Sequence, residues 1–97
     1  MIEIREKNLH LKDHQKELIE KKIGKLLHLS EILQDESVKI KVEIEHDPIK
    51  EKHKQLFVIV NIFAPGHTLR AEIHDEKLRN ALDICEEKLR NQIGKLK

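Results

Sequence analysis

The 97-residue chain has the length of one domain and can bury one modest hydrophobic core. Its 19 Lys and Arg nearly balance 18 Asp and Glu, and the net charge of +1 excludes a uniformly basic protein. Aromatic residues make up only 2%, namely Phe57 and Phe63, which argues against modules that stack single-stranded bases on aromatic side chains.

The first half of the chain predicts a strand, a helix and a second strand. Residues 2–5 alternate between apolar and charged side chains, which indicates a short strand with one solvated face. Residues 12–29 carry apolar side chains at helical spacing, and Asp13 is expected to cap that helix. Residues 38–45 alternate strictly and form the clearest strand pattern in the sequence.

The second half predicts two more strands. Residues 46–54 are polar and favour a loop. Residues 56–63 are apolar on both registers, which is typical of a central strand. Pro65 and Gly66 predict a tight turn, because proline presets the second position and glycine allows a positive φ at the third. A fourth strand is expected at residues 69–74.

A second long helix ends the chain. Asp75 is expected to cap it, and the helix is expected to run from Glu76 to the C-terminal lysines. Its apolar stripe is Leu78, Leu82, Cys85, Leu89, Ile93 and Leu96.

These elements predict a single α+β domain over residues 1–97 with the order β-α-β-β-β-α. A right-handed crossover makes the first two strands parallel, and two hairpins then give a four-stranded sheet of order 1-2-3-4. Each strand has only one clearly apolar register, so both helices are expected on the same face. The predicted architecture is a two-layer sandwich.

No pattern in the sequence indicates catalysis, so we expect neither an enzyme nor a metal or cofactor site. The seven histidines are scattered, and the glycines form no phosphate loop. Cys85 lies on the apolar stripe of the last helix and is expected to be buried and inert. A lone cysteine excludes an internal disulfide and favours a reducing compartment. With no apolar run near 20 residues and no signal peptide, we expect a cytoplasmic protein without a membrane partner.

Basic side chains concentrate on the two predicted helices. The first helix carries Lys16, Lys21, Lys22 and Lys25. The last changes sign along its length, because residues 75–87 hold five acids against two bases whereas residues 88–97 hold four bases and no acid. Two interpretations are open. Cations near a helix C-terminus stabilise the helix dipole, and a ridge of cations can also contact nucleic-acid phosphates.

Several segments, taken in order, are similar to one known family. They are Leu9-His10-Leu11, Lys22-Ile23-Gly24-Lys25-Leu26, the Pro65-Gly66 turn, Ala81-Leu82-Asp83, Glu87-Lys88-Leu89 and Gln92-Ile93. Together with the order of elements, they resemble the ribosome hibernation-promoting factors, also called ribosome-associated inhibitor A or protein Y. The resemblance covers residues 2–97, and the length is that of the short family members.

The resemblance implies a translation inhibitor that promotes ribosome hibernation under stress. Family members bind the small ribosomal subunit in the channel between its head and body, across the messenger path and the tRNA sites. Their basic side chains contact phosphates of the ribosomal RNA. Carried over by position, the RNA-binding set is Lys22, Lys25, Lys88, Lys95 and Lys97, with Arg90 beside Asn91, where the family has an arginine.

The chain also departs from the family pattern. Leu78 and Arg79 stand where a Met-Tyr pair is usual, and Gly94 stands where a basic residue is common. In the third strand, Phe57, Ile59 and Phe63 occupy the register expected to point away from the helices, where polar residues are typical.

These three apolar side chains favour an interface on the open face of the sheet, because no third layer remains to cover them. The interface would serve a weak homodimer or a protein partner, unless the side chains only pack on one another and on their neighbours. Two alternative functions therefore stay open. One is an interaction module of this fold without ribosome binding, and the other is a double-stranded-RNA module, which also places three antiparallel strands beneath two helices.

Overall fold

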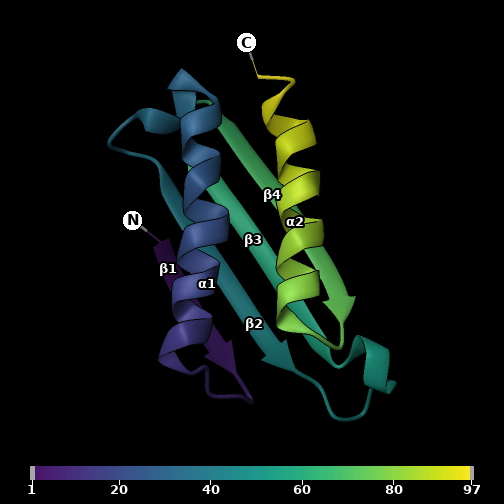
Figure 1. Ribbon diagram of the computed structural model, residues 1–97. Coiled ribbons are helices and arrows are strands. Elements are labelled where there is room, and N and C mark those ends of the chain that lie inside the picture. The colour runs from purple at the N-terminus through teal and green to yellow at the C-terminus, as the bar shows by residue number, and fades with distance from the viewer. Residues whose placement is uncertain (1, 97) are drawn as a thin grey trace.

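A computed structural model describes residues 2–96 as one sheet covered by two helices (Figure 1). The strands are β1 (Ile2–Lys7), β2 (Lys39–His46), β3 (Leu56–Ala64) and β4 (His67–Asp75), and the helices are α1 (Asp13–Gly24) and α2 (Leu78–Ile93). Short 3₁₀ turns occur at Lys25–Leu29, Glu31–Gln34 and Lys52–Lys54. The order β-α-β-β-β-α confirms the predicted sequence of elements.

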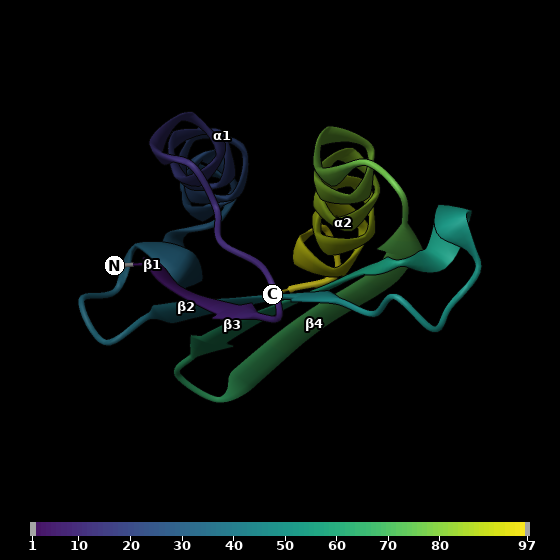
Figure 2. The same ribbon diagram turned by 90° about the horizontal axis from the view of Figure 1, so that it is seen from below.

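The sheet has the predicted strand order β1-β2-β3-β4. β1 pairs with β2 in parallel, and the other two pairings are antiparallel. Both helices lie on the same face of the sheet, and among residues 2–96 no further layer covers the opposite face (Figure 2). The predicted two-layer α+β sandwich is therefore confirmed.

The core lies between the helices and the inward register of the sheet. Val42, Val58, Val60 and Ile62 are completely buried, and they belong to the even-numbered register that the alternating pattern assigned to the inside. From the helices, Ile19, Ile23, Leu82 and Leu89 complete this layer. Each such side chain contributes about 1.5–3 kcal/mol relative to an exposed one, so the alternation specifies the register strongly.

The hairpin between β3 and β4 turns at Pro65 and Gly66, as predicted. Ala64 pairs with His67 across the turn, which leaves these two residues at its centre. Gly66 has a φ of +72°, a conformation that glycine adopts without the steric cost of a Cβ. The turn keeps β3 and β4 in the register that aligns their inward side chains.

Both helix starts differ from the expectation. Asp13 does not cap α1, because the extended residue before the helix is Lys12, whose N–H donates to Gln15 Oε1 at 2.8 Å. α1 also ends at Gly24 and passes into a 3₁₀ turn, so the expected helix at 12–29 is shorter. α2 begins at Leu78, two residues later than expected. Asp75 still accepts hydrogen bonds from the N–H groups of Glu76 and Lys77, directly before this helix.

Cys85 is buried in the core on the inner side of α2, as predicted. Its burial raises the pKa of the thiol to about 11, against a small opposite effect from the charge of Lys88. The reactive thiolate is therefore scarce at neutral pH.

We expect Cys85→Ala to lower the free energy of unfolding by about 1 kcal/mol, because the change removes one buried sulfur atom. In the native wild type, a thiol reagent at pH 8 should label Cys85 slowly, at a rate that rises when urea unfolds the protein. Rapid labelling of the native protein would contradict its burial.

Candidate nucleic-acid interface

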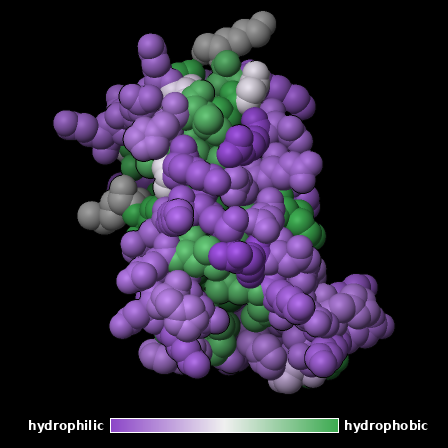
Figure 3. All heavy atoms as spheres, in the orientation of Figure 1, coloured by the Kyte–Doolittle hydropathy of each residue, from purple (hydrophilic) through white to green (hydrophobic). Residues whose placement is uncertain are grey.

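The two helices lie side by side and expose one broad face to solvent (Figure 1). That face is mostly hydrophilic, because the apolar stripes of both helices turn toward the sheet (Figure 3). Cations and carboxylates meet along the line between the helices, and we call this set the interhelical cluster. Its members are Lys22, Lys25, Asp83, Glu86 and Arg90.

Ion pairs join the members of the interhelical cluster across the two helices. Lys22 Nζ on α1 pairs with Asp83 Oδ1 on α2. Lys25, directly after α1, places its Nζ 3.0 Å from Glu86 Oε1. Arg90 donates from Nη2 to the same Glu86 oxygen at 3.1 Å, from one turn further along α2. One carboxylate thus holds a lysine from one helix and an arginine from the other.

Glu86 is the buried charge of the cluster, with only 9% of the residue exposed. Burial alone would raise the pKa of its carboxyl. Hydrogen bonds from Lys25 and Arg90, together with the charges of Lys25 and Lys22, outweigh burial and hold the pKa below its ordinary value. The carboxylate is therefore ionised at neutral pH, and removing its partners would leave a buried charge uncompensated.

The cations of the cluster differ in how freely they can meet a ligand. The side chains of Lys25 and Arg90 are 49% and 50% exposed, so each keeps donors beyond the one directed at Glu86. The side chain of Lys22 is only 20% exposed and its amine is engaged by Asp83. An approaching phosphate therefore finds donors at Lys25 and Arg90, whereas Lys22 adds mainly its charge.

The other residues of the RNA-binding set lie outside the cluster. Lys88 lies on the side of α2 toward β4, and its Nζ donates to the carbonyl oxygen of Glu72 at 3.0 Å. Lys95 is exposed just beyond the end of α2. Lys97 lies outside the described residues. The structure thus gathers three of the six cations and places Lys88 and Lys95 apart from them.

Sequence reasoning missed Asp83 and Glu86 as partners of these cations. Their spacing carried a signal, since Asp83, Glu86 and Arg90 are three and four residues apart and share one side of a helix. The sequence alone did not show that this side of α2 turns toward α1.

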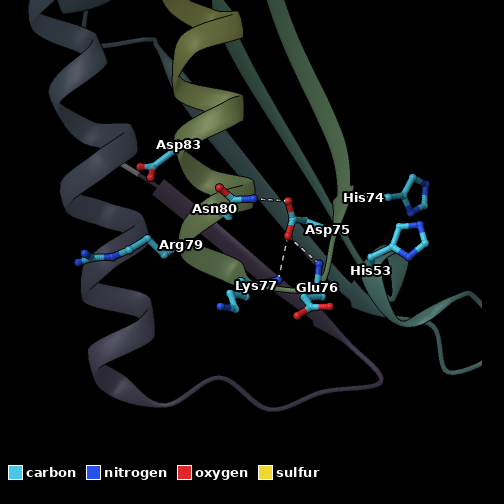
Figure 4. Close-up of a pocket in the computed structure, with 8 residues that line it drawn as sticks. All are labelled: His53, His74, Asp75, Glu76, Lys77, Arg79, Asn80 and Asp83. Carbon is cyan, nitrogen blue, oxygen red and sulfur yellow. Dashed lines mark hydrogen bonds between the residues drawn. The ribbon is translucent and has the colours of Figure 1, made fainter.

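A hollow of about 720 Å³ opens beside the start of α2 (Figure 4). It is lined by His53, His74, Asp75, Glu76, Lys77, Arg79, Asn80 and Asp83. Asp75 Oδ1 accepts the N–H groups of Glu76 and Lys77 at 2.7 and 3.0 Å, and its Oδ2 accepts the amide of Asn80 at 2.7 Å. The hydrogen bond from the Lys77 N–H, together with those from Asn80 and Glu76, lowers the pKa of the Asp75 carboxyl despite its partial desolvation. The carboxylate therefore braces the junction of β4 and α2.

The histidines follow no metal-binding arrangement. His74 stacks on Phe57 with ring centroids 4.2 Å apart, and His53 Nε2 lies 3.1 Å from Glu51 on the nearby loop. Across residues 2–96, no three side chains of His, Cys, Asp or Glu come together as metal ligands. Within the same residues, no helix has both the length and the apolar character that a bilayer crossing requires.

The opposite face of the molecule carries the three apolar residues of β3, as the register predicted. Phe63 is 38% exposed, with Lys41 Nζ 5.9 Å from its ring centroid. Phe57 and Ile59 are half-buried, because His74 stacks on the former and charged side chains flank the latter. The neighbours therefore cover this apolar strip only in part.

This small α+β domain, with cations along its two helices, resembles one known protein family. The sequence model of that family, the sigma 54 modulation protein / S30EA ribosomal protein family, matches residues 2–97. The chain belongs to this family, which confirms the resemblance found in its sequence. The family is not one of enzymes.

Particular relatives agree with this assignment. The chain is 33% identical over 94 residues to the ribosome hibernation promotion factor of Bacillus subtilis (strain 168). The matched region covers 97% of this chain and 47% of that protein. It thus spans about half the length of that curated relative. Two solved structures share the fold at lower identity. The N-terminal domain of Thermus thermophilus protein Y has a TM-score of 0.73 at 22% identity, covering 94% of this chain and 91% of that one. A ribosomal subunit interface protein from Coxiella burnetii has a TM-score of 0.75 at 23% identity, covering 97% and 93%.

We expect Glu86→Gln to lower the free energy of unfolding at pH 7 by about 1–3 kcal/mol, because two charged donors lose their ionised acceptor. Urea unfolding measures this change. The matched control is Glu87→Gln, which removes the same charge from an exposed position of α2 and should change stability by less than about 0.5 kcal/mol.

The difference between wild type and Glu86→Gln should also depend on pH. The pKa of Glu86 is lower in the folded state than its ordinary value of 4.5, so the unfolded state binds the proton more readily. The contribution of Glu86 is therefore complete above pH 4.5 and is lost as the pH falls through the folded-state pKa. A difference in stability that stays constant from pH 7 to pH 3 would contradict this role.

Proposed function

We propose that this protein binds the small ribosomal subunit through phosphates of its ribosomal RNA, blocks the messenger and tRNA channel, and so promotes ribosome hibernation. The observation that carries the proposal is membership of a ribosomal-protein family along residues 2–97. A relative of twice the length is named a ribosome hibernation promotion factor, and a structural neighbour is named a ribosomal subunit interface protein.

The charges of the interhelical cluster support a phosphate-binding role despite a net charge of only +1 for the chain. Within the interhelical cluster, three cations face two carboxylates, so an excess of positive charge remains between the helices. Apart from the cluster, Lys88 and Lys95 add positive charge on the side of α2 toward β4 and just beyond the end of α2. Phosphate contacts of this kind release counterions, and binding through them weakens steeply with salt.

The proposed RNA-contacting set is Lys22, Lys25, Lys88, Arg90, Lys95 and Lys97. Lys25 and Arg90 form its centre, because both are half-exposed and held in place by Glu86. Because Glu86 already orients these two side chains, they lose less conformational entropy when they bind a phosphate.

An interaction module of the same fold without ribosome binding is the second candidate. It is favoured by the ion pairs that already engage Lys22, Lys25 and Arg90 within the molecule, and by the partly exposed apolar strip on the open face. Binding to purified ribosomal subunits distinguishes the two candidates.

We expect the protein to sediment with purified small subunits at low salt and to be released as salt rises. The variant Lys88→Glu plus Lys95→Glu should bind more weakly, and loss of two phosphate contacts should lower the slope of log K against log salt by about two units. Its inhibition of cell-free translation should fall in parallel.

The matched control for that variant is Lys50→Glu plus Lys52→Glu, which makes the same change of charge at exposed positions of the loop between β2 and β3. This control should bind and inhibit as the wild type does. A folded Lys88→Glu plus Lys95→Glu variant that inhibits translation fully would overturn the residue assignment. Wild-type protein that never sediments with small subunits would overturn the proposed function.

A further inference from the structure

We infer that the open face of the sheet is a self-complementary interface through which two copies of this chain associate face to face. This surface lies on the side of the sheet away from the helices (Figure 2). The inference does not depend on ribosome binding, because it uses none of the residues of the proposed RNA-contacting set.

The charges of the open face separate into two halves along β2 and β4. Asn61 of β3 lies between Lys41 and Arg70, and the next outward residue, Ile59, lies between Glu43 and Glu72. The basic half consists of Lys39, Lys41 and Arg70. The acidic half consists of Glu43, Glu45 and Glu72. The sign of the charge therefore reverses between two adjacent rows of the sheet, near its middle.

β1 shows the same reversal with the opposite signs. Glu3 lies beside Lys41, and Arg5 lies beside Glu43. The change from acid to base in β1 thus falls between the same two rows as the change from base to acid in β2. A single line across the sheet, perpendicular to the strands, separates opposite charges in β1, β2 and β4.

A two-fold axis parallel to this line brings opposite charges together. When a second copy is turned about an axis that lies between the two sheets, each strand faces its own equivalent running in the opposite direction. Lys41 then faces Glu43 of the second copy, Arg70 faces Glu72, and Glu3 faces Arg5. Symmetry repeats each of these pairs, so the arrangement is isologous and closes at two copies. Long charged side chains span the distance of about 10 Å at which two sheets pack.

The apolar residues of β3 complement one another under the same operation. Phe63 is the exposed aromatic at the basic end of the strand, and Phe57 lies at the acidic end. A depression of about 390 Å³ at the acidic end includes Phe57 and Ile59 in its lining. Its other lining residues are Arg5, Glu6, Lys7, Glu43, Ile44 and Glu45. The two-fold operation therefore brings the partly exposed Phe63 of each copy opposite Phe57 and the depression beside it in the other copy.

The size of the face predicts a weak dimer. Four strands about 4.8 Å apart and about eight residues long present roughly 500 Å² per copy, below the roughly 800 Å² of a standard interface. Ion pairs within the monomer compete as well, since Arg70 lies 2.8 Å from Glu72 and Arg5 lies 3.3 Å from Glu3. All four side chains are half-exposed or more, and pairs of this kind stabilise the monomer little.

Sedimentation velocity over a concentration series tests the inference. We expect wild-type protein to pass from monomer to dimer between micromolar and millimolar concentration in low salt, with a dissociation constant that rises with salt. Phe63→Ser should weaken the dimer at least tenfold. A wild-type protein that stays monomeric at millimolar concentration in low salt would overturn the inference.

A charge-swap pair tests the geometry itself. Lys41→Glu places a new glutamate opposite Glu43, and Glu43→Lys places a new lysine opposite Lys41, so each variant alone should be monomeric. An equimolar mixture restores every opposite-charge contact and should form a heterodimer. The matched control, Lys21→Glu, makes the same change of charge at an exposed position of α1 and should dimerise as the wild type does.

Circular dichroism and thermal unfolding establish that each variant is folded before its association is compared. If the single variants dimerise as well as the wild type, or if their mixture stays monomeric while the wild type dimerises, the proposed interface is wrong. If the wild type captures other proteins through this face but does not associate with itself, the inference is wrong in the same way.

Discussion

Two helices can cover only one face of a four-stranded sheet, and this limit shapes every surface of the protein. The covered face takes the apolar register of all the strands, so Val42, Val58, Val60 and Ile62 are completely buried. The uncovered face takes the other register, which is mostly charged in β1, β2 and β4 and, apart from Asn61, apolar in β3. The outward sides of the helices form the third surface, which is mostly hydrophilic and includes the ion pairs of the interhelical cluster.

Under the proposed function, the helical surface would combine two roles in the same side chains. Lys25 and Arg90 bind the buried carboxylate of Glu86 and thereby join α2 to the end of α1. Because both remain half-exposed, they can also meet phosphate oxygens without leaving Glu86. A cation without a carboxylate partner would carry more net charge to an RNA surface, but it would have to be ordered on binding. Pairing with Glu86 thus lowers the net charge that attracts RNA from a distance, but it holds the side chains of Lys25 and Arg90 in place before binding.

Most of the fold could be predicted from the sequence, because the signals were local and repeated. Strict alternation over residues 38–45 specified both a strand and its inward face, and the Pro65-Gly66 turn specified the hairpin that follows β3. The ends of the helices were less accurate. Asp13 resembles a cap, yet Lys12 precedes the helix: its N–H donates to Gln15 Oε1, and its carbonyl oxygen accepts from the N–H groups of Gln15 and Lys16.

The candidate site was predictable in its residue types but not in its arrangement. The basic content of the two helices and the positional resemblance to the family together indicated the cations, whereas their partners depended on how each helix is rotated about its own axis. Burial of Leu82 and Leu89 fixes that rotation for α2 and turns Glu86 toward α1. The same rotation places Lys88 over β4, away from the interhelical cluster. The apolar stripe and the three- and four-residue spacing of Asp83, Glu86 and Arg90 can therefore place these side chains on one side of α2, but the sequence alone does not show that this side meets α1.

The separation of the two outer surfaces has a consequence for binding. Helices and open sheet face lie on opposite sides of one layer of strands, so a ligand on one surface leaves the other accessible (Figure 2). In the proposed dimer the two sheets face each other, and the helical surfaces of both copies point outward in opposite directions. Such a dimer would present its two proposed phosphate-binding surfaces to separate partners, because a single rigid RNA surface cannot contact both. RNA binding would then leave the free energy of self-association unchanged, and self-association would leave that of RNA binding unchanged. The exception would be a steric clash between two large partners bound to the two copies of one dimer.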